Sequence, residues 1–163
     1  MLESVPSEFI MKKASWSLDE LAWAFSNGVI GAQAVVDIAI SMVAGGDGSA
    51  LVLSLAGLTH AELPEVKELL QSQGASDNEG EIRAKWLWLV LSWIYETHGT
   101  SSAAFDALDA LYADFGYPEE MEPFGPYASA YQAKDDPNEA REVVLSEWRS
   151  YLAKGESRFG HTR

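Results

Sequence analysis

The feature that most constrains the fold is an almost unbroken apolar run over residues 86–95, in which Ser92 is the only clearly polar residue. Such a run fits either a buried strand or a helix that is apolar on every side. Three tryptophans within this run are too bulky for a short strand packed on both faces. Apolar residues also recur at helical spacing, at Ile82, Trp86, Leu89 and Trp93. We therefore predict a buried helix over residues 81–97, with Trp86, Leu89 and Trp93 in the core.

Local signals elsewhere predict further helices packed around this one. Ser17 and Glu20 have the spacing of a capping box, and Asp136 followed by Pro137 is typical of a helix start. We expect an all-α fold, a single-domain bundle of about six or seven helices around residues 81–97. The domain is expected to cover residues 1–154, with residues 1–15 as a loosely docked arm. Gly155 is expected to end the last helix, which leaves residues 155–163 as a flexible C-terminal tail.

Composition limits the chemistry and the location. The 163 residues suffice for one domain and include no cysteine, which excludes disulfides, thiolate metal sites and a cysteine nucleophile. The apolar run at residues 86–95 rises only about 15 Å as a helix, half of the roughly 30 Å core of a bilayer. The N-terminus carries no segment of signal-peptide character. We expect a cytoplasmic protein with no membrane association.

The charge is strongly acidic and unevenly distributed. Eleven basic and 25 acidic residues give a formal net charge of −14. Segment 101–147 holds eleven acids against Lys134 and Arg141, which gives −9 for this segment (2 − 11). Phosphates and anionic lipids would be repelled, so we expect no nucleic acid and no membrane partner, and favour a basic protein partner. The alternative is that the acidity only keeps the protein soluble.

No pattern in the sequence predicts catalysis or cofactor binding. The three histidines are isolated, and neither a His-Glu-x-x-His nor a Gly-x-Ser-x-Gly pattern occurs. Glu119, Glu120 and Glu122 are close together but lack the glycine and terminal glutamate of a calcium loop. We predict no catalytic, metal-binding or cofactor-binding residue and expect a protein that is not an enzyme. A metal-dependent enzyme that uses these glutamates remains a third hypothesis.

Three stretches resemble a family of small acidic bacterial proteins classed as a domain of unknown function. They are residues 15–28 (SWSLDELAWAFSNG), residues 85–89 (KWLWL) and residues 111–124 (LYADFGYPEEMEPF). The resemblance runs from about residue 15 to residue 154, and the part from Tyr112 to Glu119 is the most specific. Members are similar to immunity proteins encoded beside secreted bacterial toxins. The resemblance therefore implies an immunity protein, and it supplies no catalytic residues.

Charge and resemblance together suggest that the chain binds and neutralises a cognate toxin domain. The alternative is a helical adaptor or scaffold protein with another basic partner. We place the partner site on residues 116–127, called here the acidic loop, and on its flanks, because acids and aromatic anchors occur together there. The predicted contact residues are Asp114, Tyr117, Glu119, Glu120, Glu122, Phe124, Tyr127, Asp135 and Asp136. The competing interpretation is that prolines and aromatics only hold this loop on the bundle. The sequence leaves the oligomeric state open.

Overall fold

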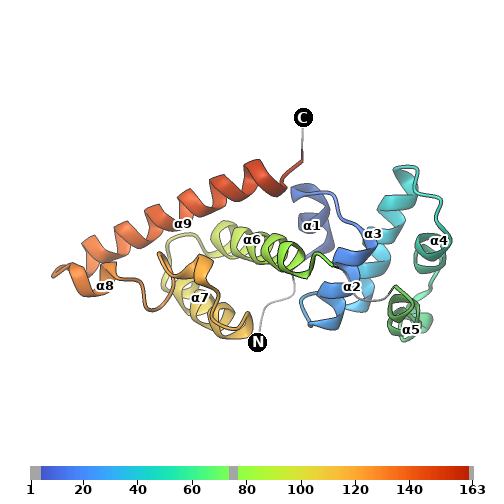
Figure 1. The fold of residues 1–163 in the computed structure, drawn as a ribbon, viewed down its shortest axis with the longest axis horizontal. Helices are drawn as coiled ribbons and strands as arrows, with labels where there is room; N and C mark the ends of the chain where they lie inside the picture. The colour runs from blue at the N-terminus through green and yellow to red at the C-terminus, as the bar shows by residue number, and fades with distance from the viewer. Residues whose placement is uncertain (1–4, 74–76, 162–163) are drawn as a thin grey trace. The chain divides into compact units, whose positions relative to one another are not determined.

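The computed structural model describes residues 5–73 and 77–161, and all regular structure in these ranges is helical (Figure 1). The elements are α1 (Ser7–Lys13), α2 (Leu18–Ser26), α3 (Ala32–Ala44), α4 (Ala50–Ala56), η1 (His60–Glu62), α5 (Glu65–Gln71), α6 (Glu79–His98), α7 (Ser102–Asp114), η2 (Glu119–Met121), α8 (Ala130–Ala133) and α9 (Pro137–Phe159). The all-α prediction is confirmed. The described ranges contain more helices than expected, because the short α1 and α8 lacked strong signals in the sequence.

The predicted central helix is α6, and it is the most deeply buried stretch described. Every residue from Trp86 to Ser92 is buried, including Leu89, whereas Trp93 is partly exposed. Within the described ranges, no helix is both long enough and apolar enough to cross a bilayer.

By its contacts the described chain divides into two compact units, and the division falls inside α6 between Trp86 and Leu87. The N-terminal unit contains the described residues up to Trp86 together with His161. The C-terminal unit is Leu87–Gly160. A single folding domain over residues 1–154 stays a prediction.

In the N-terminal unit, α3 contacts α1, α2, α4 and α5. Its side chains Val35, Ile38 and Ala39 are buried. The predicted capping box at the start of α2 is present. The Ser17 backbone N–H donates to Glu20 Oε1 at 2.9 Å, and the Glu20 N–H donates to Ser17 Oγ at 3.3 Å.

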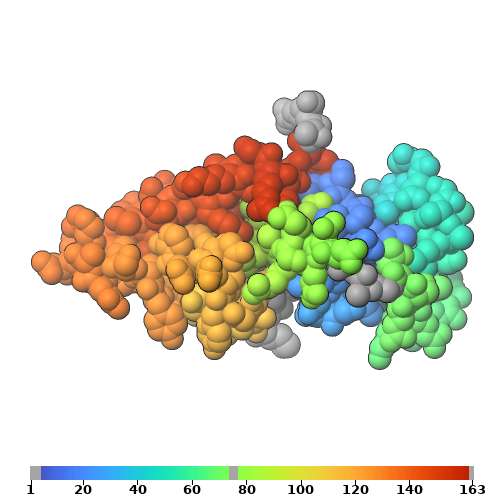
Figure 2. Space-filling model, in the orientation of Figure 1, coloured from blue at the N-terminus to red at the C-terminus, as the bar shows by residue number. Residues whose placement is uncertain are grey.

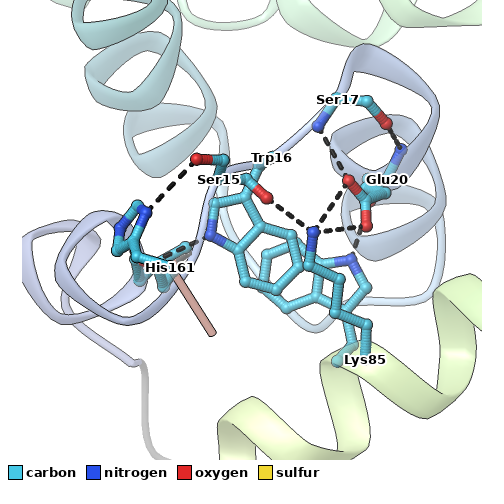
Figure 3. A network of polar contacts seen from close by, with 8 residues as sticks. Ser15, Trp16, Ser17, Glu20, Lys85 and His161 are labelled. Carbon is cyan, nitrogen blue, oxygen red and sulfur yellow. Dashed lines mark hydrogen bonds and ion pairs between the residues drawn. The ribbon is translucent and has the colours of Figure 1, made fainter. Parts of the chain in front are cut away.

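A network around Lys85 ties the first half of α6 to the start of α2 (Figure 3). Lys85 Nζ lies 2.8 Å from Glu20 Oε2 and 4.3 Å from the centre of the Trp16 ring. Trp16 stacks on Trp86 with ring centres 4.0 Å apart, and Trp86 Nε1–H donates to the Glu20 carbonyl at 2.9 Å. His161 Nε2 lies 2.9 Å from the Met11 carbonyl oxygen in the same unit. These contacts join Trp16 and Glu20 to Lys85 and Trp86 within the N-terminal unit.

In the C-terminal unit, α9 crosses α6 at Gly155. A Cβ built at this glycine would lie 2.0 Å from Trp88 Cδ1, and Trp88 Nε1–H donates to the Leu152 carbonyl at 3.2 Å. Only a residue without a side chain allows this approach. The prediction that Gly155 ends the last helix is therefore wrong, since α9 continues to Phe159.

Candidate functional site

The acidic loop begins where α7 ends in two successive left-handed residues. Gly116 has φ +71° and Tyr117 has φ +59°. The Tyr117 N–H donates to the Tyr112 carbonyl at 2.8 Å, and the Gly116 N–H donates to the Ala113 carbonyl at 3.1 Å. These two bonds make a Schellman cap, and the Tyr112 and Tyr117 rings form its hydrophobic contact with centres 5.2 Å apart. A left-handed conformation costs a residue other than glycine about 1–2 kcal/mol, so Tyr117 holds an unfavourable backbone position.

The middle of the loop is anchored by side chains that point into the protein. Phe124 is 1% exposed, and its ring lies 6.4 Å from that of Trp148 and 5.2 Å from that of Tyr151. Met121 in η2 is fully buried. Phe124, which we predicted as a contact residue, therefore has no surface to offer a partner. Its role fits the competing interpretation, in which the aromatic residue holds the loop in place.

Two of the predicted aromatic residues are strongly exposed. Tyr117 is 63% exposed and Tyr127 is 79% exposed, although both lie beside the partly buried Tyr112. The Tyr112 and Tyr127 ring centres are 6.0 Å apart. We call Tyr112, Tyr117 and Tyr127 the tyrosine cluster. In the space-filling view, the segment between α7 and α8, coloured amber to orange, forms part of the visible surface of the C-terminal unit (Figure 2).

The carboxylates near the tyrosine cluster have no basic partners in the part of the chain that the structure describes. Asp114, Glu119, Glu120 and Glu122 are all exposed, and none forms an ion pair among the described residues. Asp114 ends α7, and the last turn of that helix contains no basic residue. An acid at this position is opposed by the helix dipole, so helix stability does not explain it.

The other two predicted acids lie at the start of α9. Both Asp135 and Asp136 are exposed. The Asp136 side chain accepts a hydrogen bond from the Asn138 N–H at 2.9 Å, and Pro137 occupies the first helical position. Helix capping alone is a sufficient reason for an aspartate at position 136.

Both basic residues of segment 101–147 are engaged within the unit. Arg141 donates to the Thr100 carbonyl at 2.7 Å and lies 4.5 Å from the centre of the Phe105 ring. Lys134 Nζ lies 3.5 Å from Glu139 Oε1. Neither of these contacts is to a carboxylate of the acidic loop.

Two hollows flank the end of the acidic loop. The first, of about 240 Å³, is lined by Phe105, Leu108, Asp109, Phe124, Gly125, Pro126 and Tyr131. The second, of about 420 Å³, is lined by Tyr112, Glu122, Pro123, Gly125, Tyr127 and Ser129. Gly125 belongs to both, and a Cβ there would lie 2.8 Å from the Met121 carbonyl oxygen. The turn between the hollows therefore accepts a larger residue only if its backbone moves.

Sequence reasoning missed Asp109 and Tyr131, which line the first hollow. Partial burial raises the pKa of Asp109, and the charge of Asp106 raises it further. Burial also raises the pKa of Tyr131, as does Asp109, while Arg141 opposes the shift. In the sequence, Asp109 lies away from the apolar face of its helix and gives no sign of a site. Only the fold brings Asp109 and Tyr131 together in the lining of one hollow. Deeper in the unit, burial raises the pKa of Tyr151, with Glu120 contributing.

The described residues offer no obvious place for a metal ion. Among them, no three His, Cys, Asp or Glu side chains are grouped so that they could hold one. The hypothesis of a metal-dependent enzyme that uses Glu119, Glu120 and Glu122 gains no support from this arrangement.

Comparison with known proteins identifies the family. A family model described as an uncharacterized protein conserved in bacteria, DUF2247, matches residues 7–156. No curated protein and no solved structure matches the chain. The matched range contains both units almost completely, and it includes all three stretches on which the resemblance rests. The chain therefore belongs to the bacterial family DUF2247.

Proposed function

We propose that this protein is an immunity protein that binds and neutralises a cognate secreted bacterial toxin domain, and that it acts by binding and not by catalysis. The observation that carries the proposal is the exposed tyrosine cluster beside carboxylates that have no basic partners within the described chain. Aromatic anchors ringed by polar groups are typical of the energetic centre of protein interfaces.

Charge supports a basic partner. Segment 101–147 has a formal charge of −9 (2 − 11), and its two basic residues are engaged with Thr100, Phe105 and Glu139. Many secreted toxins are nucleases with basic substrate clefts, and an acidic surface can occlude such a cleft by imitating phosphate charge. Complementary charge would also raise the association rate.

Backbone strain gives a second, independent support. Tyr117 holds a left-handed conformation that glycine or asparagine would adopt at lower cost. A strained residue persists where the surrounding structure or a function requires its side chain. The Tyr117 ring is mostly exposed, so its contact with Tyr112 uses only part of it. A partner that packs on the exposed part of the Tyr117 ring would account for the part of the strain that the contact with Tyr112 does not explain.

The resemblance gives the biological context. The resemblance noted in the sequence implies a similarity to immunity proteins encoded beside secreted toxins, and the family to which this chain belongs is bacterial. The proposed contact set is narrower than the sequence suggested. It keeps Asp114, Tyr117, Glu119, Glu120, Glu122, Tyr127 and the exposed Asp135. It omits the buried Phe124 and also Asp136, whose side chain caps α9.

The first experiment asks whether the protein co-purifies with the product of a neighbouring gene, whether that product is toxic, and whether this protein abolishes its toxicity. We then replace Glu119, Glu120 and Glu122 with Lys. We expect affinity to fall by about 10- to 100-fold, with a slower association and a weaker dependence on salt, because charge steers this contact. The melting temperature should barely change, since these side chains are exposed and unpaired.

The matched control makes the same change of net charge on the N-terminal unit. Glu65, Glu68 and Asp77 are exposed there, so their replacement with Lys tests whether total charge alone matters. Equal loss of affinity in both variants would contradict a local site. Binding to a basic protein without inhibition of any toxin would favour the adaptor alternative.

A further inference from the structure

The second hollow has the chemistry of a site for a cationic side chain. The residues that line it are two tyrosines, Tyr112 and Tyr127, an acidic residue, Glu122, and Pro123, Gly125 and Ser129. A volume of about 420 Å³ lies at the small end of the range for ligand sites. It is suited to one side chain of a partner.

No cation of the described chain neutralises this hollow. Glu122 is exposed and forms no ion pair among the described residues. Arg141 and Lys134 are engaged elsewhere, with Phe105 and Glu139 respectively. The negative charge of the site is therefore available to a group that comes from outside.

Ring geometry indicates where such a group would lie. The Tyr112 and Tyr127 planes are tilted by 59° with centres 6.0 Å apart. A planar group between two parallel rings needs roughly 7 Å, which is two van der Waals contacts of about 3.5 Å. The cation therefore does not lie between the two rings, and it would pack on the part of Tyr127 that lines the hollow, since this side chain is 79% exposed.

Guanidinium fits this arrangement better than ammonium. It stacks flat on aromatic rings and makes two parallel hydrogen bonds to one carboxylate. The chain already contains one guanidinium placed over an aromatic ring, that of Arg141 over Phe105.

The site is held in shape before any partner arrives. Phe124, between Pro123 and Gly125, is buried against Trp148 and Tyr151. Gly125 donates its N–H to the Met121 carbonyl, which closes the turn. A preformed site loses less entropy on binding.

We propose that this hollow receives an arginine side chain of the partner, with the guanidinium stacked on Tyr127 and paired with Glu122. The inference deepens the proposed function and rests on it for the identity of the partner. It does not depend on the partner for its test, because the chemistry of the site predicts binding of a small arginine probe.

The test is an NMR titration of the full chain with N-acetyl-arginine methylamide. The neutral isostere N-acetyl-citrulline methylamide and the lysine analogue serve as comparison probes. We expect saturable shifts at the amides of Gly125 and Ser129 with the arginine probe, and weaker binding of the other two. Equal shifts with citrulline, or shifts confined to other regions, would overturn the inference. If the lysine analogue binds as tightly as the arginine probe, the proposed preference of the site for guanidinium is wrong.

Variants locate the contact. Glu122→Gln and Tyr127→Ala should each weaken the arginine probe by about two- to five-fold, the size of an exposed cation–π or charge contact. Tyr127→Phe keeps the ring, and Glu119→Gln changes an acid that does not line the hollow, so both should bind as the parent does. Unchanged binding in Glu122→Gln and Tyr127→Ala would refute the site.

The two proposals fail separately. If the arginine probe binds here but no toxin is bound or inhibited, the arginine site is supported and the proposed function is refuted. If the toxin binds but Glu122→Gln and Tyr127→Ala leave its affinity unchanged, the proposed function stands and the arginine site falls.

Discussion

Replacement of Gly155 with Ala tests the packing of α9 on α6 within the C-terminal unit. The new Cβ would lie 2.0 Å from Trp88 Cδ1 and 2.5 Å from Trp88 Nε1. Trp88 is fully buried, and close-packed protein interiors leave little room for a ring to move. The two helices must therefore separate locally.

The cost follows from three effects. Overpacking destabilises the fold by about 1–3 kcal/mol. Loss of the hydrogen bond from Trp88 Nε1 to the Leu152 carbonyl leaves the buried indole N–H without an acceptor, which costs a further ~1–3 kcal/mol. Alanine has a higher helix propensity than glycine, which offsets about 1 kcal/mol of this loss. We expect a net loss of about 3 kcal/mol, which lowers the melting temperature by about 6–12 °C in a chain of this length.

The assay is urea unfolding together with calorimetry, and the chain offers an internal control. Gly80 also lies in a helix, but a Cβ there would meet nothing within 4 Å. Gly80→Ala should therefore stabilise by about 0.5–1 kcal/mol. If Gly155→Ala raises stability as Gly80→Ala does, the close contact with Trp88 is absent and the reasoning fails.

Two further predictions concern the acidic segment. Asp109→Asn should have a higher melting temperature than the parent at neutral pH, and this difference should disappear at acidic pH. The raised pKa of Asp109 means that the parent loses stability as pH rises above the ordinary value of 3.8 and through the folded-state pKa. A temperature difference independent of pH would exclude this cause. Tyr117→Asn should be nearly neutral for stability, because relief of about 1 kcal/mol of backbone strain offsets a lost ring contact of about 0.5–1.5 kcal/mol. The same variant should bind the toxin more weakly, and unchanged affinity would remove Tyr117 from the site.

Local sequence signals predicted the helix starts well. The capping box at Ser17 and the Asp136-Pro137 start both form in the structure. Capping depends on residues within one turn, so the sequence contains all the information needed. The short α1 lacks a side-chain cap, so the sequence predicted a loosely docked arm here and not a helix whose Ile10 is fully buried.

The errors arose where distant residues decide the outcome. Gly155 has the character of a helix terminator, yet its role is set by Trp88, which lies far away in sequence. Phe124 and Tyr127 stand three residues apart in one loop, and only the fold buries the first and exposes the second. The sequence therefore located the acidic loop but did not separate its anchors from its exposed surface.

The stack of Trp16 on Trp86 gives the N-terminal unit an optical signal of its own. Two indole rings 4.0 Å apart and inclined by 24° are close enough for their electronic transitions to couple. Such coupling produces a paired positive and negative band in the circular dichroism spectrum, superimposed on the helical signal. Both rings belong to the N-terminal unit. Loss of this band on heating would follow the unfolding of that unit, while the helical signal follows both.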